Sequence, residues 1–193
     1  MKLYFVRHSE VIEKYKGCYN GHIDVPLSEK GKEDAKELAK KLAHIHFDRA
    51  FCSDLLRAKQ TIDMFDLDCD IVYTPHLREK SWGRHEGMRF EEIVAKGLQY
   101  KNFEQWIAVL DGEPFREYLA RINKYFHTTL LKQNAQNILV VTHAGVIKTL
   151  LSLYNHLSLE EAFSMPLSYS DYICYDTMQK RFLQKSEQKA FLV

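Results

Sequence analysis

The sequence is poor in the features that mark membrane, secreted and zinc-binding proteins. None of its four cysteines belongs to a C-x-x-C pair, and no cysteine–histidine spacing resembles a zinc site. No apolar run approaches the ~20 residues that a membrane-spanning helix needs. Arg7, His8 and Glu10 interrupt the first apolar run, so the N-terminus does not resemble a secretory signal. We therefore expect a cytoplasmic protein with reduced thiols and no membrane partner.

An excess of charge of either sign is also missing. The chain has 27 lysine and arginine residues against 26 aspartate and glutamate residues. No overall field draws it to nucleic acid, so any specificity for an anion must come from a local arrangement of side chains. With 193 residues, of which 46% are hydrophobic, we expect a single domain over residues 1–193 with a normal core.

Short apolar runs alternate with amphipathic segments along the chain. The predicted strands are Lys2–Val6, Arg49–Cys52, Asp70–Tyr73, Ile138–Thr142, Tyr172–Tyr175 and Arg181–Leu183. Helices are predicted after a Ser28 cap, from Ser53 or Asp54 to Phe65, over Phe90–Lys96 and Asn102–Leu110, from Pro114 to Leu130, and over Val146–Asn155. This order predicts an α/β fold with a mostly parallel sheet covered on both faces and a late antiparallel edge. The segment Trp82–Leu110 would be a helical excursion over one edge of the sheet.

Two histidines follow buried strands in matching contexts. His8 ends the run L-Y-F-V-R-H and His143 ends the run I-L-V-V-T-H. If both strands are parallel, their carboxyl ends open onto the edge where α/β sheets hold ligands. Two imidazoles beside Arg7 then predict an anion site, with His8 as a nucleophile toward phosphorus or, alternatively, an inert hydrogen-bonded residue. Arg7 and His8 can face one ligand only if the chain turns at residues 7–9.

Arg57 and Glu79 are further candidates, although each has an ordinary alternative. An arginine in the first turn of a helix opposes the helix dipole, which a nearby anion would explain, but a solvated surface arginine is equally consistent with the pattern. A leaving alkoxide needs a proton, and Glu79 could supply it. The competing carboxyl groups are those of Glu86, Glu91 and Glu92.

A metal site is the main chemical alternative. The H-x-D pair at His22 and Asp24 could join His8 and His143 as the ligands of a metallohydrolase. The spacing matches no strong ligand motif, so we expect no metal.

Four motifs in order resemble the histidine phosphatase superfamily, the phosphoglycerate mutase-like proteins. They are V-R-H-S-E at 6–10, S-D-L-L-R-A at 53–58, L-R-E at 77–79 and V-T-H-A-G at 141–145. The resemblance implies a three-layer α/β/α sandwich and a phosphomonoesterase that uses neither metal nor cofactor. It also implies that His8 is the phosphorylated nucleophile, that Glu79 is the proton donor, and that Arg7, Arg57 and His143 bind the phosphoryl group.

Within this superfamily the chain resembles small bacterial phosphatases of the α-ribazole phosphatase type. The segment Y-N-G-H at 19–22 carries part of this resemblance and would place Asn20, Gly21 and His22 near the phosphate or the leaving group. Simple turn chemistry also explains Asn and Gly in a loop. The expected partner is a small phosphorylated metabolite, with α-ribazole phosphate as one candidate.

Two departures from the family pattern concern the substrate. Ser9 stands where the family usually has Gly, and Lys14 stands where many members have Asn. A special backbone conformation would be harder for Ser9, although its hydroxyl could donate to phosphate, and Lys14 could attract an acidic substrate. Two other functions stay open: a cofactor-dependent phosphoglycerate mutase and a non-catalytic module that binds phosphorylated ligands.

Overall fold

A mixed sheet of six strands forms the centre of the computed structural model, which describes residues 1–183. The predicted domain spans 1–193, so its part over 184–193 lies outside the described residues. The strand order is β3-β2-β4-β1-β5-β6, and β1 to β4 run parallel to one another, while β5 is antiparallel to both of its neighbours, β1 and β6. The strands are β1 Lys2–Arg7, β2 Arg49–Ser53, β3 Ile71–Thr74, β4 Asn137–Thr142, β5 Tyr172–Asp176 and β6 Arg181–Phe182. The predicted parallel sheet with a late antiparallel edge is confirmed.

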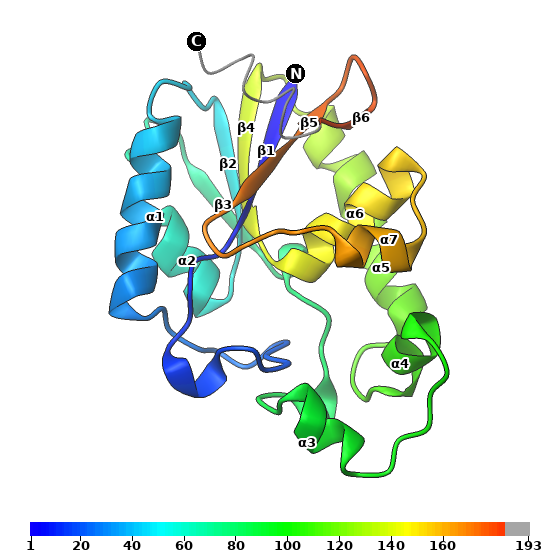
Figure 1. The fold of residues 1–193 in the computed structure, drawn as a ribbon. Helices are drawn as coiled ribbons and strands as arrows, with labels where there is room; N and C mark the ends of the chain where they lie inside the picture. The colour runs from blue at the N-terminus through cyan, green and yellow to red at the C-terminus, as the bar shows by residue number, and fades with distance from the viewer. Residues whose placement is uncertain (184–193) are drawn as a thin grey trace.

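Helices cover both faces of this sheet (Figure 1). One face carries α1 and α2, the other carries α5 and α6, and α7 lies beside α6. This arrangement is the predicted three-layer α/β/α sandwich. The helices are α1 Glu29–Leu42, α2 Leu56–Ile62, α3 Phe90–Val94, α4 Phe103–Val109, α5 Phe115–Thr128, α6 Ala144–Asn155 and α7 Leu159–Ser164.

The sequence of β1 shows how one strand serves both layers. Leu3 and Phe5 are buried against α5 and α6, whereas Tyr4 and Val6 are buried against α1 and α2. Successive side chains of a strand point to opposite faces, so a strand covered on both faces is apolar at every position. The continuous apolar runs at residues 3–6 and 138–141 therefore become the two central strands.

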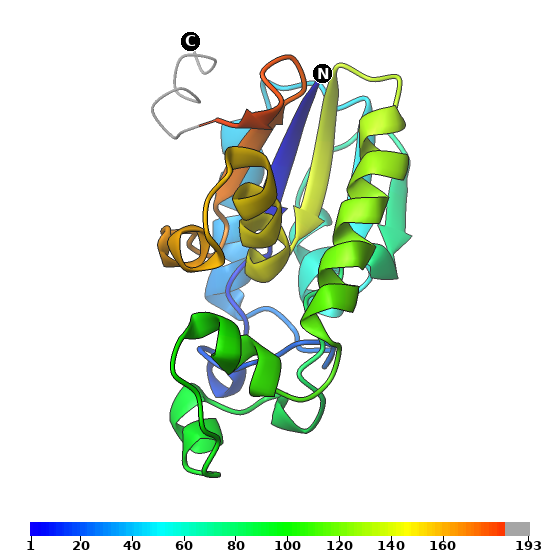
Figure 2. The same cartoon turned by 90° about the vertical axis from the view of Figure 1, so that its right-hand side faces the viewer.

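The carboxyl ends of the parallel strands meet at one edge of the sheet. Helices α3 and α4 lie beyond this edge, below the sheet in Figures 1 and 2. The helical excursion predicted over Trp82–Leu110 is therefore confirmed. Across residues 1–183, no helix combines the length and the apolar character that crossing a bilayer requires.

The structure differs from the prediction at two helices. α2 begins at Leu56 without a side-chain cap, because the Ser53 hydroxyl and the Asp54 carboxylate bind partners elsewhere in the fold. α7 was not predicted, although the capping box of Ser158 with Glu161 starts it. Its six residues are too few to establish a helical period in the sequence.

Candidate active site

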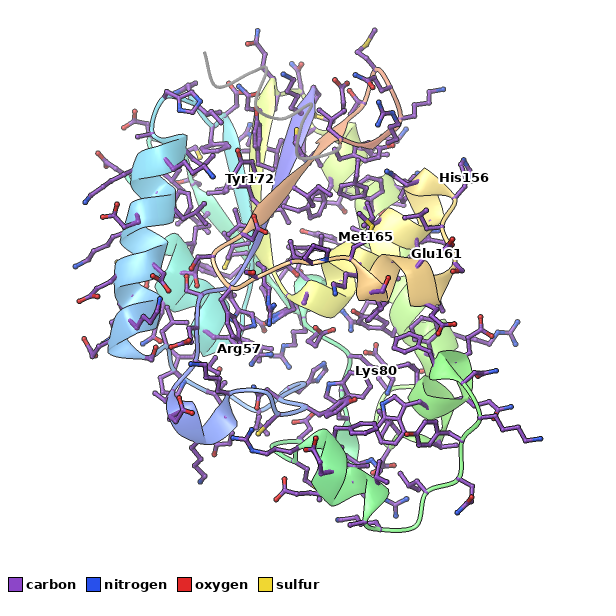
Figure 3. All side chains as sticks on the ribbon, viewed as in Figure 1. Arg57, Lys80, His156, Glu161, Met165 and Tyr172 are labelled. Carbon is purple, nitrogen blue, oxygen red and sulfur yellow. The ribbon has the colours of Figure 1, made fainter. Side chains whose placement is uncertain are left out.

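A cavity of about 430 Å³ opens at the carboxyl edge of the sheet. All five residues predicted to carry the chemistry line it, although they come from distant parts of the chain. They are Arg7, His8, Arg57, Glu79 and His143. In Figure 3, Arg57 is labelled beside α2 and Lys80, the neighbour of Glu79, is labelled below the sheet, in the same part of the molecule.

The His8 ring is held in one tautomer. Its Nδ1 lies 2.8 Å from the carbonyl oxygen of Ser9, and a carbonyl can only accept a hydrogen bond. Nδ1 therefore carries the hydrogen, and Nε2 keeps its lone pair. The backbone has left the strand here, since β1 ends at Arg7, which gives the turn that the two side chains need to face one cavity.

His143 comes from the end of β4, and its ring centroid lies 5.2 Å from that of His8. Its Nε2 lies 2.8 Å from the hydroxyl of Ser53 at the end of β2. A hydroxyl can donate or accept, so this contact allows the tautomer in which Ser53 donates to His143 Nε2. In this tautomer Nδ1 carries a hydrogen and can donate to a ligand.

Burial keeps both imidazoles neutral at neutral pH. Loss of hydration lowers the pKa of His8 well below its ordinary value, and the charges of Arg57 and Arg7 lower it further. The pKa of His143 is lowered in the same way, first by burial and then by Arg57 and His8. A neutral His8 has an unprotonated nitrogen that can attack an electrophile, even with two guanidinium groups beside it.

The two arginines are anchored by backbone carbonyl groups. Arg7 donates from Nη1 to the carbonyl of Leu167 at 2.6 Å, and Arg57 donates to the carbonyls of Gly21 and Ile23 at 2.7 and 2.9 Å. Burial lowers the pKa of Arg57 to about 10, so it stays charged at neutral pH. These anchors fix both positive charges at the cavity, which an anion can neutralise.

Buried polar atoms without hydrogen-bond partners gather at this cavity. Within residues 1–183, four of the five such side-chain atoms belong to residues that line it. The four are Arg7 Nε, Asn20 Oδ1, Arg57 Nε and His143 Nδ1. Buried polar groups are normally paired, so their concentration here indicates a site that a polar ligand completes.

Glu79 is the carboxyl group that lines the cavity, and three donors hold it. Its Oε1 accepts from the Tyr118 hydroxyl at 2.9 Å and the Lys80 amide at 3.0 Å, and its Oε2 accepts from the Gly145 amide at 2.9 Å. A Cβ atom at Gly145 would lie 2.2 Å from the carboxylate, so only glycine allows this approach.

The competing glutamates have other partners. Glu86 accepts from the His22 amide, the Ser81 hydroxyl and the Trp82 amide at 2.9–3.1 Å. Glu92 caps the start of α3, and Glu91 is exposed on the same helix. Neither Glu86, Glu91 nor Glu92 lines the cavity, which leaves Glu79 as the candidate acid.

The segment at residues 20–22 divides between two places. Asn20 and Gly21 line the cavity, and Asn20 is anchored by donating to the carbonyl of Tyr15 at 2.9 Å. His22 does not line it, because its Nε2 donates to the carbonyl oxygen of Glu79 at 2.9 Å. His22 therefore contacts the backbone of the candidate acid rather than the cavity.

His22 and Asp24 do not join His8 and His143 in a metal site. Asp24 accepts from the amide of Leu56, and His22 Nε2 donates to the carbonyl oxygen of Glu79. In the part of the chain that the structure describes, no three His, Cys, Asp or Glu side chains form a cluster suited to a metal ion.

The structure also places the two departures from the family pattern outside the cavity. Ser9 is fully buried, and its hydroxyl lies 2.6 Å from that of Ser170. Lys14 is exposed, with its Nζ over the ring of Tyr15. Neither residue lines the cavity.

Sequence reasoning missed two tyrosines, Tyr118 and Tyr169, that complete the site. Tyr169 covers the Arg7 guanidinium at 4.0 Å and lies 5.6 Å from the His8 ring. Tyr169 and Tyr118 reach the site from β5's leading loop and from α5, and no local motif marks either position. The cavity also has an apolar wall. It consists of Tyr19, Trp82, Phe90, Ile107, Phe115 and Phe163.

Known proteins are similar to this chain in sequence and in fold. A phosphatase that acts on adenosylcobalamin/α-ribazole by name, from Salmonella typhimurium, is 30% identical over 159 residues, covering 79% of this chain and 78% of that protein. A 2,3-bisphosphoglycerate-dependent phosphoglycerate mutase from Gloeobacter violaceus is 27% identical, covering 86% of this chain and 81% of that protein. The crystal structure of the α-ribazole phosphatase from Shigella flexneri superposes with a TM-score of 0.81 at 26% identity, covering 96% and 95% of the two chains.

The family itself is established by a match over nearly the whole chain. Residues 3–186 match the histidine phosphatase superfamily (branch 1). This match confirms the prediction of an enzyme of the phosphoric monoester hydrolase type. The chain, with two neutral imidazoles and two anchored arginines at the edge of its sheet, belongs to the histidine phosphatase superfamily.

Proposed function

We propose that this protein hydrolyses the phosphate monoester of a small metabolite through a phosphohistidine intermediate. The observation that carries the proposal is the state of His8: its Nδ1 is bonded to the Ser9 carbonyl and its Nε2 is free on a neutral ring. Two fixed guanidinium groups and the His143 ring lie around it. Phosphoryl transfer depends mainly on such positioning and on charge around the equatorial oxygens.

In the first step, His8 Nε2 attacks phosphorus in line with the leaving oxygen. An N–P bond forms while the P–O bond to the leaving group breaks, and Glu79 gives its proton to the leaving oxygen. Arg7 and Arg57 neutralise the phosphoryl oxygens, and the Nδ1 hydrogen of His143 donates to one of them. Each of these groups has a buried nitrogen that a phosphoryl oxygen would pair.

In the second step, a water molecule attacks the phosphohistidine. Glu79, now ionised, accepts a proton from the water, the N–P bond breaks, and inorganic phosphate leaves with His8 restored. The same charges stabilise both transition states. The reaction therefore needs no metal and no cofactor.

The apolar wall indicates that the leaving group of the substrate has an apolar portion. Trp82, Phe90 and Phe163 border the same cavity as His8, so an aromatic or otherwise apolar portion of a substrate would be buried there. α-Ribazole phosphate meets this description, and relatives with that activity in their names share the fold. We propose it as the first substrate to test.

The decisive experiment compares the wild type with His8→Ala on p-nitrophenyl phosphate and on α-ribazole phosphate. We expect His8→Ala to lower kcat/KM by at least about 10³-fold, because the attacking nitrogen is gone. Substrate carrying ³²P should give an acid-labile protein label in the wild type and none in the variant. The exposed His44→Ala variant is the matched control. Thermal unfolding establishes that each variant is folded, and substantial turnover by folded His8→Ala would reject the mechanism.

Two further assays on the wild type distinguish the proposed phosphatase from a phosphoglycerate mutase and from a non-catalytic binding module. Incubation with 3-phosphoglycerate and a bisphosphoglycerate primer would give rapid isomerisation without phosphate release if the chain were a mutase. A module that only binds phosphorylated ligands would bind α-ribazole phosphate and form no label. We expect phosphate release that vanadate inhibits and a chelator does not.

A further inference from the structure

Glu79 lies on an irregular connection, so its position depends on contacts from elsewhere in the fold. It follows the short 3₁₀ turn Pro75–Leu77 and precedes another at Gly83–His85. Neither turn can fix a side chain by itself, because such short turns have few internal hydrogen bonds. The groups that hold this connection therefore decide where the candidate acid stands.

Arg121 on α5 holds most of that connection with one side chain. Its Nη1 donates to the carbonyls of Pro75, His76 and Arg78 at 3.3, 2.9 and 3.1 Å. Its Nη2 donates to the carbonyl of Glu79 itself at 3.4 Å. Four of the five residues from 75 to 79 are thus bonded to one guanidinium group.

A carboxylate fixes the orientation of that guanidinium. Glu113 accepts from Arg121 Nε at 2.8 Å and from Nη2 at 2.7 Å, which is a bidentate pair. Both side chains are largely buried, with 18% and 16% of their surface exposed. A planar, half-buried pair of this kind holds its geometry, unlike an exposed ion pair.

The carboxylate of Glu79 is held from the same helix. Tyr118 lies three residues before Arg121, on the same side of α5, and donates to Glu79 Oε1. One helix therefore bonds both the backbone and the carboxylate of the candidate acid. Arg78 is paired at 2.6 and 2.7 Å with Asp54, which follows β2, so the connection is also held by a residue outside α5.

We propose that Arg121, oriented by Glu113, is a positioning residue that sets Glu79 for proton transfer to the leaving group. The proposal rests on the proposed function, because it concerns the acid of that reaction. Arg121 does not line the cavity and touches no substrate. Its effect must therefore be confined to the two proton transfers that Glu79 assists, where a displacement of about 1 Å can cost on the order of 10²-fold in rate.

The test uses two substrates that differ in their need for an acid. An alkyl phosphate has a basic leaving oxygen that must be protonated, whereas 2,4-dinitrophenyl phosphate leaves readily as an anion. We expect Arg121→Met to lower kcat/KM for the alkyl ester by about 10–100-fold and for the dinitrophenyl ester by less than about threefold, because kcat/KM reports the steps up to release of the leaving group and excludes the later hydrolysis of the phosphohistidine, which both esters share. Arg121→Lys, which keeps the charge but not the planar fork, should give an intermediate loss for the alkyl ester.

The control for the substitution is Arg116→Met, at an exposed position of the same helix. It should change neither rate by more than about threefold. A double variant is the control for the mechanism. In a Glu79→Gln background, Arg121→Met should not lower the rate for the alkyl ester more than that for the dinitrophenyl ester, because the acid that Arg121 positions is already gone. Thermal unfolding of every variant shows whether it is folded.

The outcomes separate the two proposals. Equal losses for the two esters, or the same selective loss in the Glu79→Gln background, would overturn the positioning role while leaving the phosphatase reaction intact. Failure of the wild type to hydrolyse either ester would instead overturn the proposed function, and the role of Arg121 with it. A loss confined to the alkyl ester and to proteins that retain Glu79 supports both.

Discussion

At the scale of single residues, Ser9 lies next to the proposed nucleophile but faces away from the cavity. Its amide donates to the Thr61 hydroxyl at 2.9 Å, and its own hydroxyl pairs with that of Ser170. Ser9 does not have a positive φ, so its position does not need the conformational freedom of glycine, whereas Ser170 has a φ of 54°. The Ser9–Ser170 pair therefore joins two loops of the site without entering it.

We predict that Ser9→Ala costs stability and spares activity. Deleting one partner removes a part-buried hydrogen bond to the Ser170 hydroxyl, which costs about 1 kcal/mol of the free energy of unfolding. Because the lost hydroxyl does not face the cavity, kcat/KM should fall by less than about threefold. Urea denaturation and the aryl phosphate assay measure the two quantities.

The matching Ser170→Ala variant tests whether the effect belongs to the pair. If it does, the double variant loses less stability than the two single losses added together. A large fall in kcat/KM for Ser9→Ala with unchanged stability would instead place the hydroxyl in contact with the substrate.

Much of the site was predictable from single residues, because key side chains of the site directly follow predicted strands. His8 and His143 each follow a continuous apolar run, and the rule that parallel strands open at one edge brings them together. Tyr118, Tyr169 and Arg121 could not be found in this way. Each acts through a contact between residues far apart in the chain, such as the 2.9 Å bond from Tyr118 to Glu79, and nothing in the local sequence records such a contact.

At the scale of one element, the start of α1 is packed against the segment that follows the nucleophile. Ser28 caps the helix by accepting from the Gly31 amide at 2.9 Å, and the Ser28 amide donates to the Glu10 carbonyl at 2.9 Å. A Cβ atom at Gly31 would lie 2.0 Å from that same carbonyl oxygen. The glycine therefore allows helix and loop to approach, despite its cost inside a helix.

We predict that Gly31→Ala destabilises the protein, against the usual direction of this change. Helix propensity favours alanine by about 1 kcal/mol, but the clash with the Glu10 backbone forces a shift that costs about 1–3 kcal/mol more than this gain. Urea denaturation should show a lower midpoint for Gly31→Ala than for the wild type. Lys36→Ala, at an exposed position of the same helix, gives the reference for a change that only alters propensity. A higher midpoint for Gly31→Ala would mean that the helix can move away from the loop.

The elements themselves followed from the sequence to different degrees. Long amphipathic segments such as α1 and α5 were predicted with starts near those observed, because cap residues precede a buried stripe that repeats over several turns. The start of α2 was wrong, since Ser53 is a good cap by residue type but bonds to His143 from the neighbouring strand. A tertiary contact thus took the side chain that a local rule had assigned to the helix.

At the scale of the whole molecule, folding and protonation are coupled through the centre of the sheet. His8 and His143 extend the neighbouring strands β1 and β4, so the native fold buries both rings together. Nearby Arg7 and Arg57 make a proton on either ring still less favourable. Folding therefore excludes protons that the unfolded chain would bind, and stability must depend on pH.

We predict that stability falls as the pH is lowered from about 6.5 to 5, a range set by the ordinary histidine pKa of about 6.5. The native pKa values of His8 and His143 lie below that value, so in this range the unfolded chain binds more protons and acid favours unfolding. Above this range both states leave the rings neutral and the contribution is complete. Each ring should add a slope of roughly 1 kcal/mol per pH unit to the free energy of unfolding.

Substitution of one ring isolates this effect from carboxylates, which titrate at lower pH. Between pH 6.5 and 5, His143→Gln should reduce the slope of the free energy of unfolding against pH by the contribution of about one proton, because glutamine does not titrate. Ser9→Ala should lower the whole curve and leave the slope unchanged, since no titrating group is removed. Urea denaturation at closely spaced pH values measures both quantities. An equal slope for the wild type and His143→Gln would mean that His143 is already a charged imidazolium in the native protein. The hydrogen bonding described for this site requires the neutral ring and would then be wrong.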